Sequence, residues 1–496
     1  MKDIRILFTL IFGVVVTLFF GIEYPHHLHY QEQFQLFLFD NDYVMDMVRL
    51  PGGVADLLGR FCTQFFLYAW TGAIIIGVLL SVVQLLTLRL ARWGYLYGLS
   101  FVPACILWLF LLDENALLGG VWAVLLTLLV SWLFDKLPNG RMHGIILVIA
   151  VPTLYWLVGP VSIVFFLLQA RSQRNNAKYY GVFLVWIVML VIASFYVPVP
   201  ADRLWIGVHY HRYPTECPTL LWVASLSVFV LALIARLFEK WTNSYSRLVV
   251  SICSFAVVVV AMGGVVWKNA NFKAEKTMQY DFMACHQQWN RILDAINAEK
   301  PNNQIGVTVQ NLALAMQGVL PQQMFNYNQN GLMGLLPAVQ RDATSPMPTA
   351  EAFYHLGMIN VAQRTVFEAQ ESILDFQKSA RCYKRLAQTN LINGNYEVAR
   401  KYLVALQKTI FYKDWANETI QLLGNEKAIA QHSEYGHLRQ MRYNEDFYFS
   451  DQATPKMLED LYLCNTKNNM AYQYMMAAFM LTGDRDSFFK YAPKNR

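Results

Sequence analysis

Charged residues are scarce in this sequence. Only 15% of the 496 residues are charged, whereas 55% are hydrophobic, and the mean hydropathy is +0.29. Soluble proteins carry about 25% charged residues. This shortage excludes a chain that is soluble along its whole length, and it favours a membrane protein with a soluble part.

Several signatures of soluble enzymes and of nucleic-acid binding are also missing. The chain has neither a G-x-x-x-x-G-K-[ST] nor a G-x-G-x-x-G pattern, which argues against nucleotide hydrolysis and dinucleotide binding. The net charge of +6 is mild and no basic patch is interleaved with aromatic residues, so no nucleic-acid partner is expected. The seven cysteines form no C-x-x-C pair and predict neither a zinc site nor a disulfide framework.

The sequence contains instead a series of long apolar segments. The first, residues 4–22, follows Lys2 and Arg5 and precedes no small-residue cleavage pattern, which predicts an uncleaved signal anchor. Its length suits a bilayer crossing of about 20 residues. Six further spans are predicted at residues 61–88, 94–112, 116–134, 179–197, 219–238 and 248–267.

The segment 144–170 is apolar but is broken by Gly159-Pro160. Basic loops favour the cytoplasm, and all five basic clusters can lie there only if this segment enters and leaves the membrane on one side. We therefore predict a re-entrant helix pair, with a single tilted helix as the alternative, which would reverse the orientation of everything after it. The basic clusters are Lys2/Arg5, Arg89/Arg92, Lys136/Arg141, Arg171/Arg174/Lys178 and Arg236/Lys240/Arg247.

The predicted fold is all-α with two domains. Residues 1–267 are predicted to form a polytopic helical membrane bundle of about seven full spans plus the re-entrant pair. Residues 268–496 are predicted to form a soluble α-solenoid. Met1 is then cytoplasmic and Arg496 periplasmic, and the lipid bilayer of a bacterial inner membrane is the expected environment.

The carboxy-terminal part contains a repeat-like segment. The stretch "CYKRLAQTNLINGNYEVARKYLVALQK" resembles a tetratricopeptide repeat, with a turn at residues 393–396 and small residues that allow two helices to approach closely. Looser copies begin near Phe353 and Ala471, and residues 279–301 are predicted to be one amphipathic helix. Such a domain implies a protein partner, and an unrelated helical bundle is the alternative. The expected packing positions are Tyr383, Leu386, Ala387, Ala399, Leu403 and Leu406.

Acidic residues gather in two loops predicted to lie on the periplasmic side. Asp40 and Asp42 lie in "FLFDNDYVMDMVRLPGG", and Asp113-Glu114 separates two predicted spans. Such carboxylates can bind a divalent cation through oxygen ligands, or one can act as a general base toward an acceptor hydroxyl. The alternative is structural, with Asp40 or Asn41 capping an interfacial amphipathic helix that ends at Pro51.

This layout resembles the GT-C class of lipid-dependent glycosyltransferases over residues 1–267. The resemblance implies that Asp40, Asp42, Asp113 and Glu114 are catalytic, and that a polyprenyl-linked sugar is the donor at the periplasmic face. The chain as a whole also resembles an uncharacterised family of bacterial polytopic membrane proteins through "EQFQLFLF", "PGG" and "FCTQFF".

Basic and histidine residues occur on the same predicted side. Arg203 and Arg212 are predicted either to hold a lipid phosphate by bidentate hydrogen bonds or to anchor their loop to anionic headgroups. The groups His26/His27/His29 and His209/His211 are not predicted to bind a metal. Two functions stay open: the glycosyltransferase, and a non-catalytic membrane anchor whose repeat domain holds a partner in an envelope assembly.

Overall fold

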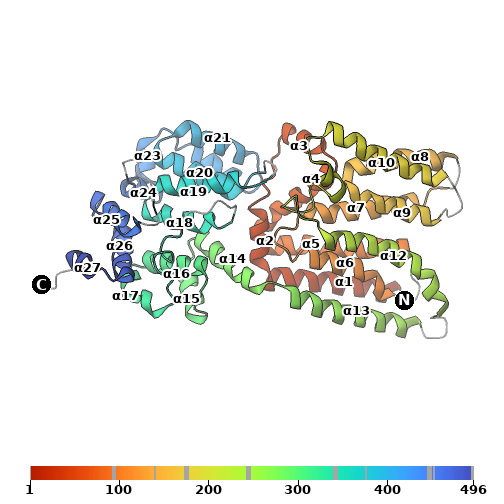
Figure 1. The fold of residues 1–496 in the computed structure, drawn as a ribbon, viewed down its shortest axis with the longest axis horizontal. Coiled ribbons are helices and arrows are strands. Elements are labelled where there is room, and N and C mark those ends of the chain that lie inside the picture. The colour runs from red at the N-terminus through yellow and green to blue at the C-terminus, as the bar shows by residue number, and fades with distance from the viewer. Residues whose placement is uncertain are drawn as a thin grey trace. The chain divides into compact units, whose positions relative to one another are not determined.

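The fold is helical throughout the part of the chain that can be described. The computed structural model describes residues 2–91, 97–138, 141–172, 178–241, 247–338, 344–374, 377–443, 450 and 453–492. In these ranges the chain forms helices joined by turns and loops, with two isolated bridges and no strand, which confirms the predicted all-α class. The chain divides into two compact units, Met1–Phe272 and Lys273–Arg496 (Figure 1). Arg92, Arg174 and Arg496, which the topology prediction uses, lie outside the described residues.

The first unit consists of apolar helices joined by short polar loops. The tightly packed helices α1, α5, α6, α7 and α12 contact one another in pairs. The helices are α1 (Lys2–Leu18), α2 (Pro25–Glu32), α3 (Asn41–Val48), α4 (Gly53–Thr63), α5 (Ala69–Ala91), α6 (Val102–Phe110), α7 (Leu118–Phe134), α8 (Arg141–Val158), α9 (Ile163–Ser172), α10 (Lys178–Tyr196), α11 (Ala201–Ile206), α12 (Thr219–Trp241) and α13 (Arg247–Asn269).

Three described stretches are long and apolar enough to cross a membrane. They are Ile4–Glu23, Ala69–Ala91 and Val249–Asn269, whereas the apolar stretches described at α6 to α10 and α12 run for 10–17 residues. Large apolar side chains on these helices face outward: Leu10 is 61% exposed and Val260 is 75% exposed. Exposure of this kind is costly in water and favourable against lipid.

Polar side chains inside the first unit are paired with one another. The Thr9 hydroxyl lies 2.9 Å from Oε1 of Gln84 and 2.8 Å from the hydroxyl of Tyr97. Nε2 of Gln84 donates to the hydroxyl of Ser100 over 2.7 Å. These bonds connect α1 and α5 with the turn before α6, and they remove the cost of burying polar groups among apolar helices.

The predicted break at Gly159 divides the segment into α8 and α9. Gly159 adopts φ +80° and ψ −156°, which glycine reaches without steric cost, and Pro160 starts the next helical turn. The break lies against the chain reversal between α3 and α4. There Gly52, at φ +84°, donates its N–H to the carbonyl of Trp156 over 2.8 Å.

Helices α4 and α7 approach each other through glycine. A Cβ on Gly59 would lie 2.4 Å from the backbone nitrogen of Gly119 and 2.7 Å from its Cα. Backbone atoms cannot move aside as a flexible side chain can. The contact between these helices therefore depends on the missing side chain at Gly59.

The second unit is a compact set of shorter helices. Helices α18/α19 and α20/α21 form two consecutive pairs, and left-handed glycines, Gly357 and Gly394, end the first helix of each pair. The helices are α14 (Phe272–Cys285), α15 (Trp289–Ala298), α16 (Gln304–Met316), α17 (Leu320–Gln323), α18 (Pro346–Leu356), α19 (Ile359–Glu371), α20 (Ala380–Asn393), α21 (Tyr396–Gln407), α22 (Lys413–Ile420), α23 (Glu426–Gln431), α24 (Tyr435–Met441), α25 (Thr454–Cys464), α26 (Asn469–Thr482) and α27 (Arg485–Tyr491).

The prediction of one helix over residues 279–301 is wrong. Helix α14 ends at Cys285 and α15 begins at Trp289. Gln287 between them has φ +55°, a left-handed conformation that side chains other than glycine seldom adopt. The reversal lets Ile292 and Ile296 of α15 join Tyr280 of α14 in one apolar cluster.

The last long helix returns to the beginning of this unit. Gln473 in α26 is 3% exposed, accepts a hydrogen bond from the backbone N–H of Leu320 over 3.2 Å, and donates to the carbonyl of Ala315 over 3.0 Å. One buried carboxamide therefore satisfies two backbone groups at the end of α16 and the start of α17.

The close contact between α4 and α7 yields a stability prediction. Gly59→Ala should lower the free energy of unfolding by about 1–3 kcal/mol, because the new methyl group overlaps backbone. Gly144→Ala is the matched control, since a Cβ there meets nothing within 4 Å. It should be neutral or stabilising by up to about 1 kcal/mol, as alanine favours helix. Thermal unfolding of the purified full-length chain in detergent measures both, and equal effects would contradict the packing described.

Candidate functional site

The first predicted acidic loop lies at the start of α3. Asp40 occupies the N-cap position with φ −140° and ψ +135°, although its carboxylate makes no capping hydrogen bond. Asp42 is exposed in the first turn, where a negative charge is favourable. Asp46 pairs with Arg49 over 3.0 Å. The helix ends before Pro51, as predicted, and only Met47 on its apolar face is fully buried.

The second predicted acidic loop, between α6 and α7, is tied to the loop before α12. Oδ2 of Asp113 lies 3.0 Å from Nε2 of His211, and Oδ1 accepts the backbone N–H of Asn115 over 2.9 Å. Nδ1 of His211 lies 3.1 Å from both the backbone nitrogen and the carbonyl oxygen of Tyr213. Both carboxylate oxygens and both ring nitrogens are thus engaged. Glu114 is half-buried beside them.

The pair alters the protonation of both of its members. Burial alone would lower the pKa of His211, but the hydrogen bond and charge of Asp113 outweigh it and the pKa is raised. Burial would raise the pKa of Asp113, yet His211 and Asn115 hold it below its ordinary value. The interaction therefore favours the charged form of each member.

Backbone bonds extend this connection between the two loops. Leu117 donates its N–H to the carbonyl of Tyr210 over 3.1 Å, and Arg212 donates to the carbonyl of Asn115 over 2.8 Å. Ala116 and His211 form an isolated antiparallel bridge. The two loops therefore form one connected structure rather than two independent surface loops.

Arg212, predicted to bind a lipid phosphate, is 7% exposed. Its Nη1 donates to the hydroxyl of Tyr30 over 3.0 Å, and its guanidinium carbon lies 3.7 Å from the centre of the Phe34 ring. The charge is thus surrounded by aromatic groups of the segment around α2. Arg203 is half-buried in α11, one turn before the helix ends.

A buried charged cluster lies beside these loops. Asp56 in α4 is 1% exposed, and its Oδ2 lies 3.0 Å from Nε and 2.9 Å from Nη2 of Arg60. His209 approaches the same oxygen with Nδ1 at 3.4 Å. Burial would lower the pKa of Arg60, but the charge of Asp56, supported by Tyr43, raises it. We name Asp56, Arg60 and His209 the α4 cluster.

Sequence reasoning did not single out Asp56 or Arg60. The available signal was an aspartate and an arginine spaced i, i+4 on one helix face directly after Pro51-Gly52-Gly53. His209 was considered only as a metal ligand, and no metal site was predicted there. Among the described residues no group of three or more His, Cys, Asp or Glu side chains is arranged to hold a metal ion.

Tyr210 fills the helix break between α8 and α9. Its hydroxyl donates to the carbonyl of Val158 over 2.5 Å and lies 3.4 Å from the backbone nitrogen of Val161. The side chain is 2% exposed. A Cβ on Gly207 would lie 2.0 Å from the ring, so this glycine makes room for it.

A second buried charged network lies in the second unit and joins α14, α18 and α20. Glu351 is 1% exposed, and its two oxygens lie 3.3 Å from Nη2 of Arg381 and 2.5 Å from Nη2 of Arg385. Arg381 also forms a bidentate pair with Asp281 at 2.6 and 2.9 Å. Burial would raise the pKa of Glu351, but Arg385 and Arg381 lower it to about 2.

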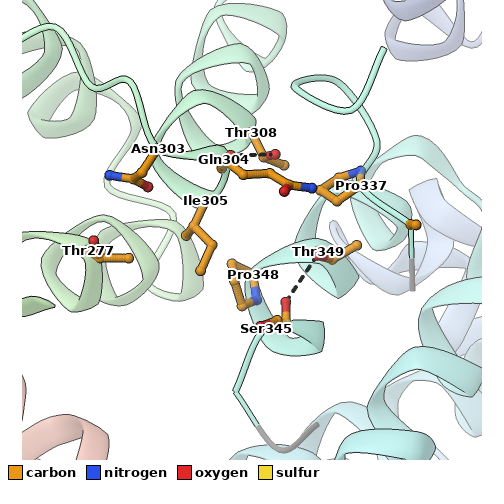
Figure 2. Close-up of a pocket in the computed structure, with 10 residues that line it drawn as sticks. Thr277, Asn303, Gln304, Ile305, Thr308, Pro337, Ser345, Pro348 and Thr349 are labelled. Carbon is orange, nitrogen blue, oxygen red and sulfur yellow. Dashed lines mark hydrogen bonds between the residues drawn. The ribbon is translucent and has the colours of Figure 1, made fainter. Parts of the chain in front are cut away.

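A small uncharged pocket lies in the same unit between α14, α16 and α18 (Figure 2). Its volume is about 250 Å³, and none of the described residues that line it is charged or aromatic. We name it the threonine pocket, because three of the lining side chains are threonines. The lining residues are Thr277, Asn303, Gln304, Ile305, Thr308, Pro337, Ala338, Ser345, Pro348 and Thr349.

These features define a class of protein: an all-helical chain with a long-helix apolar unit and a unit of shorter helices whose buried charges are paired. Residues 2–496 match a family described as a family of unknown function (DUF6057), and the chain belongs to that family. No curated protein and no solved structure matches it.

The Asp113–His211 pair predicts a pH-dependent stability. Because the pKa of His211 is raised from 6.5, its contribution is present below that value and is lost as the pH rises through the raised pKa. Asp113→Asn should therefore lower the melting temperature more at about pH 5.5 than at about pH 9. Asp202→Asn, at an exposed position of α11, is the control and should leave the melting temperature unchanged at both pH values. An identical loss at both pH values would contradict a charged pair.

The Glu351 network predicts a large and specific loss of stability. Glu351→Gln removes the carboxylate that pairs with buried Arg385, whereas Arg381 keeps Asp281, and the change should cost about 3–5 kcal/mol. Glu371→Gln on the exposed end of α19 should cost less than about 0.5 kcal/mol. Denaturant unfolding of the full-length protein, followed by tryptophan fluorescence, compares the two. Similar midpoints would show that the network does not stabilise the unit.

Proposed function

We propose that this protein is a multi-pass protein of a bacterial inner membrane that holds a protein partner through its second unit. The amino terminus would be cytoplasmic, and the domain of residues 268–496 periplasmic. The outward-facing apolar side chains of α1 and α13 support the membrane assignment, since lipid is the solvent that favours them.

The observation that carries this proposal is the state of the polar groups on the predicted periplasmic loops. Asp113 and His211 use both oxygens and both nitrogens on each other and on nearby backbone. Arg212 is buried against Tyr30 and Phe34. Groups arranged in this way stabilise loops, and they are poorly placed to accept a substrate proton or to hold a phosphate.

The topology in this proposal has about seven full spans and a re-entrant pair made by α8 and α9. Support comes from the break at Gly159, where the freed carbonyls of Trp156 and Val158 receive hydrogen bonds from Gly52 and Tyr210. Such compensation is what non-helical backbone needs at membrane depth.

The docking part of the proposal rests on the helix pairs of the second unit. We propose that α18/α19 and α20/α21 belong to a tetratricopeptide-like solenoid. The expected packing positions support this: Leu386, Ala387, Ala399, Leu403 and Leu406 are each no more than 1% exposed. Stacked pairs of this kind present extended surfaces to other proteins.

A GT-C-like glycosyltransferase that uses a polyprenyl-linked sugar, with or without a divalent cation, is the second candidate. One observation favours it. Asp42 is exposed, Glu114 is half-buried, and neither has an ion-pair partner among the described residues. Carboxylates in that state are accessible to a substrate hydroxyl.

Two experiments separate the candidates. Asp40→Asn, Asp42→Asn and Glu114→Gln should each restore normal growth and envelope integrity to a deletion strain at normal protein abundance, because none of these residues is catalytic in an anchor. Loss of a general base commonly costs about 100- to 10,000-fold in rate, so complete loss of complementation by one abundant variant would establish the enzyme instead.

The docking activity itself is tested by cross-linking in the cell. A photoreactive residue placed at Phe367 or Val404, both exposed on the second unit, should cross-link one discrete protein. Excess chain without the photoreactive residue should suppress the product, and the same residue at Asp202 in the first unit should give none. Equal cross-linking from all three positions would reject a docking role for the second unit.

A further inference from the structure

Several hydrogen-bonding groups line the threonine pocket. Thr308 donates its hydroxyl hydrogen to the carbonyl of Gln304 over 3.0 Å, and Thr349 donates to that of Ser345 over 3.0 Å (Figure 2). Thr277 does the same with Lys273 over 3.1 Å. A hydroxyl has one hydrogen and two lone pairs, so each of these oxygens can still accept a hydrogen bond but has no hydrogen left to donate.

Two carboxamides at the start of α16 supply the donors. Asn303 caps that helix, with Oδ1 accepting the N–H of Gly306 over 2.8 Å, so its NH₂ group is what it can offer a ligand. The carboxamide of Gln304 has no hydrogen-bond partner among the described residues, and it extends toward Pro337 in Figure 2. The pocket therefore offers both N–H donors and oxygen acceptors.

The lining also excludes several classes of ligand. The described residues that line it include no cationic group for a phosphate or carboxylate and no anionic group for an ammonium ion or a metal. They include no aromatic ring for a nucleobase to stack on. Ile305, Pro337 and Pro348 form small apolar walls between the polar groups. A neutral molecule with amide N–H and C=O groups matches this inventory.

The size of the pocket limits the ligand further. About 250 Å³ is below the range of about 300–1,000 Å³ that is usual for drug-sized ligands. The space suits one or two residues of a longer chain rather than a whole cofactor.

We propose that the threonine pocket receives an uncharged, amide-bearing residue, glutamine or asparagine with its flanking backbone amides, from an extended segment of a partner protein. The proposal rests on the docking function above and assigns part of that docking to a defined site. Thr308 and Thr349 accept hydrogen bonds from the segment, and Asn303 and Gln304 donate to it.

Acetyl-glutaminyl-alanine amide is the probe, and acetyl-glutamyl-alanine amide is its charged counterpart. Saturation-transfer NMR on the full chain in detergent should show saturable binding of the neutral peptide, with a dissociation constant on the order of millimolar for so small a ligand. The charged peptide should bind at least about tenfold more weakly, since its carboxylate would lose its solvation without gaining a cation.

Matched valine variants identify the site. Thr308→Val combined with Thr349→Val should weaken the neutral peptide about tenfold by removing two acceptors. Thr365→Val is the control: Thr365 is equally buried and donates to the carbonyl of Val361 over 2.8 Å, but it does not line the pocket. The Thr365→Val variant should lose a comparable amount of stability and should bind the neutral peptide with unchanged affinity.

Three results would overturn the proposal: no saturable binding of the neutral peptide, equal binding of the charged one, or equal loss of affinity with Thr365→Val. N-acetylglucosamine is titrated in parallel, and its binding without that of the peptide would identify a sugar site instead. These outcomes are independent of the cross-linking at Phe367 and Val404. The peptide-binding role of the pocket can therefore be rejected while a docking role elsewhere on the second unit remains supported.

Discussion

Backbone groups freed by a broken helix must find partners, and this requirement organises the first unit. At Gly159 the helix stops, and the carbonyls of Trp156 and Val158 lose their helical donors. The backbone of Gly52 and the hydroxyl of Tyr210 replace them. Three short sequence motifs that are far apart along the chain are joined at this one place for that reason.

Buried charged groups near this junction also need partners. Asp56 and Arg60 are both almost fully buried, and they are tolerated because each is the counter-charge of the other. Glu351 and its two arginines repeat the arrangement in the second unit. Such pairs contribute little net stability compared with apolar packing, but they are costly to break. Asp56 and Arg60 lie on one helix, α4, whereas the Glu351 network joins α14, α18 and α20.

The helices were largely predictable because the signals that define them are local. The break at Gly159 and the turn at Gly394 lie where the sequence indicated, and three of the predicted apolar spans coincide with described stretches of membrane length. The reversal at Gln287 was not predictable, because no glycine or proline marks it and the packing of α15 onto α14 selects it.

The sites were harder to predict than the helices. Asp113 was predicted as a site residue, but its partner His211 was not. The contact between Asp56 and His209 was not predicted either. Each contact joins segments that only the tertiary fold brings together. The spacing of Asp56 and Arg60 places them on one face of a helix, and this much is visible in the sequence. The spacing does not show that His209 lies beside them. The threonine pocket draws on three helices and has no sequence motif at all.

The position of Gln473 has a consequence for biosynthesis. Its carboxamide completes the end of α16 and the start of α17, although it lies near the carboxy-terminal end of the chain. The ribosome supplies this residue only after α14 to α25, so its contacts with α16 and α17 form only near the end of synthesis. Long-range closure of this kind is slow, and until it occurs the apolar surfaces of α16 and α17 are open to proteases and chaperones. Premature termination before α26 would therefore leave the end of α16 and the start of α17 without these partners, in addition to removing the last helices.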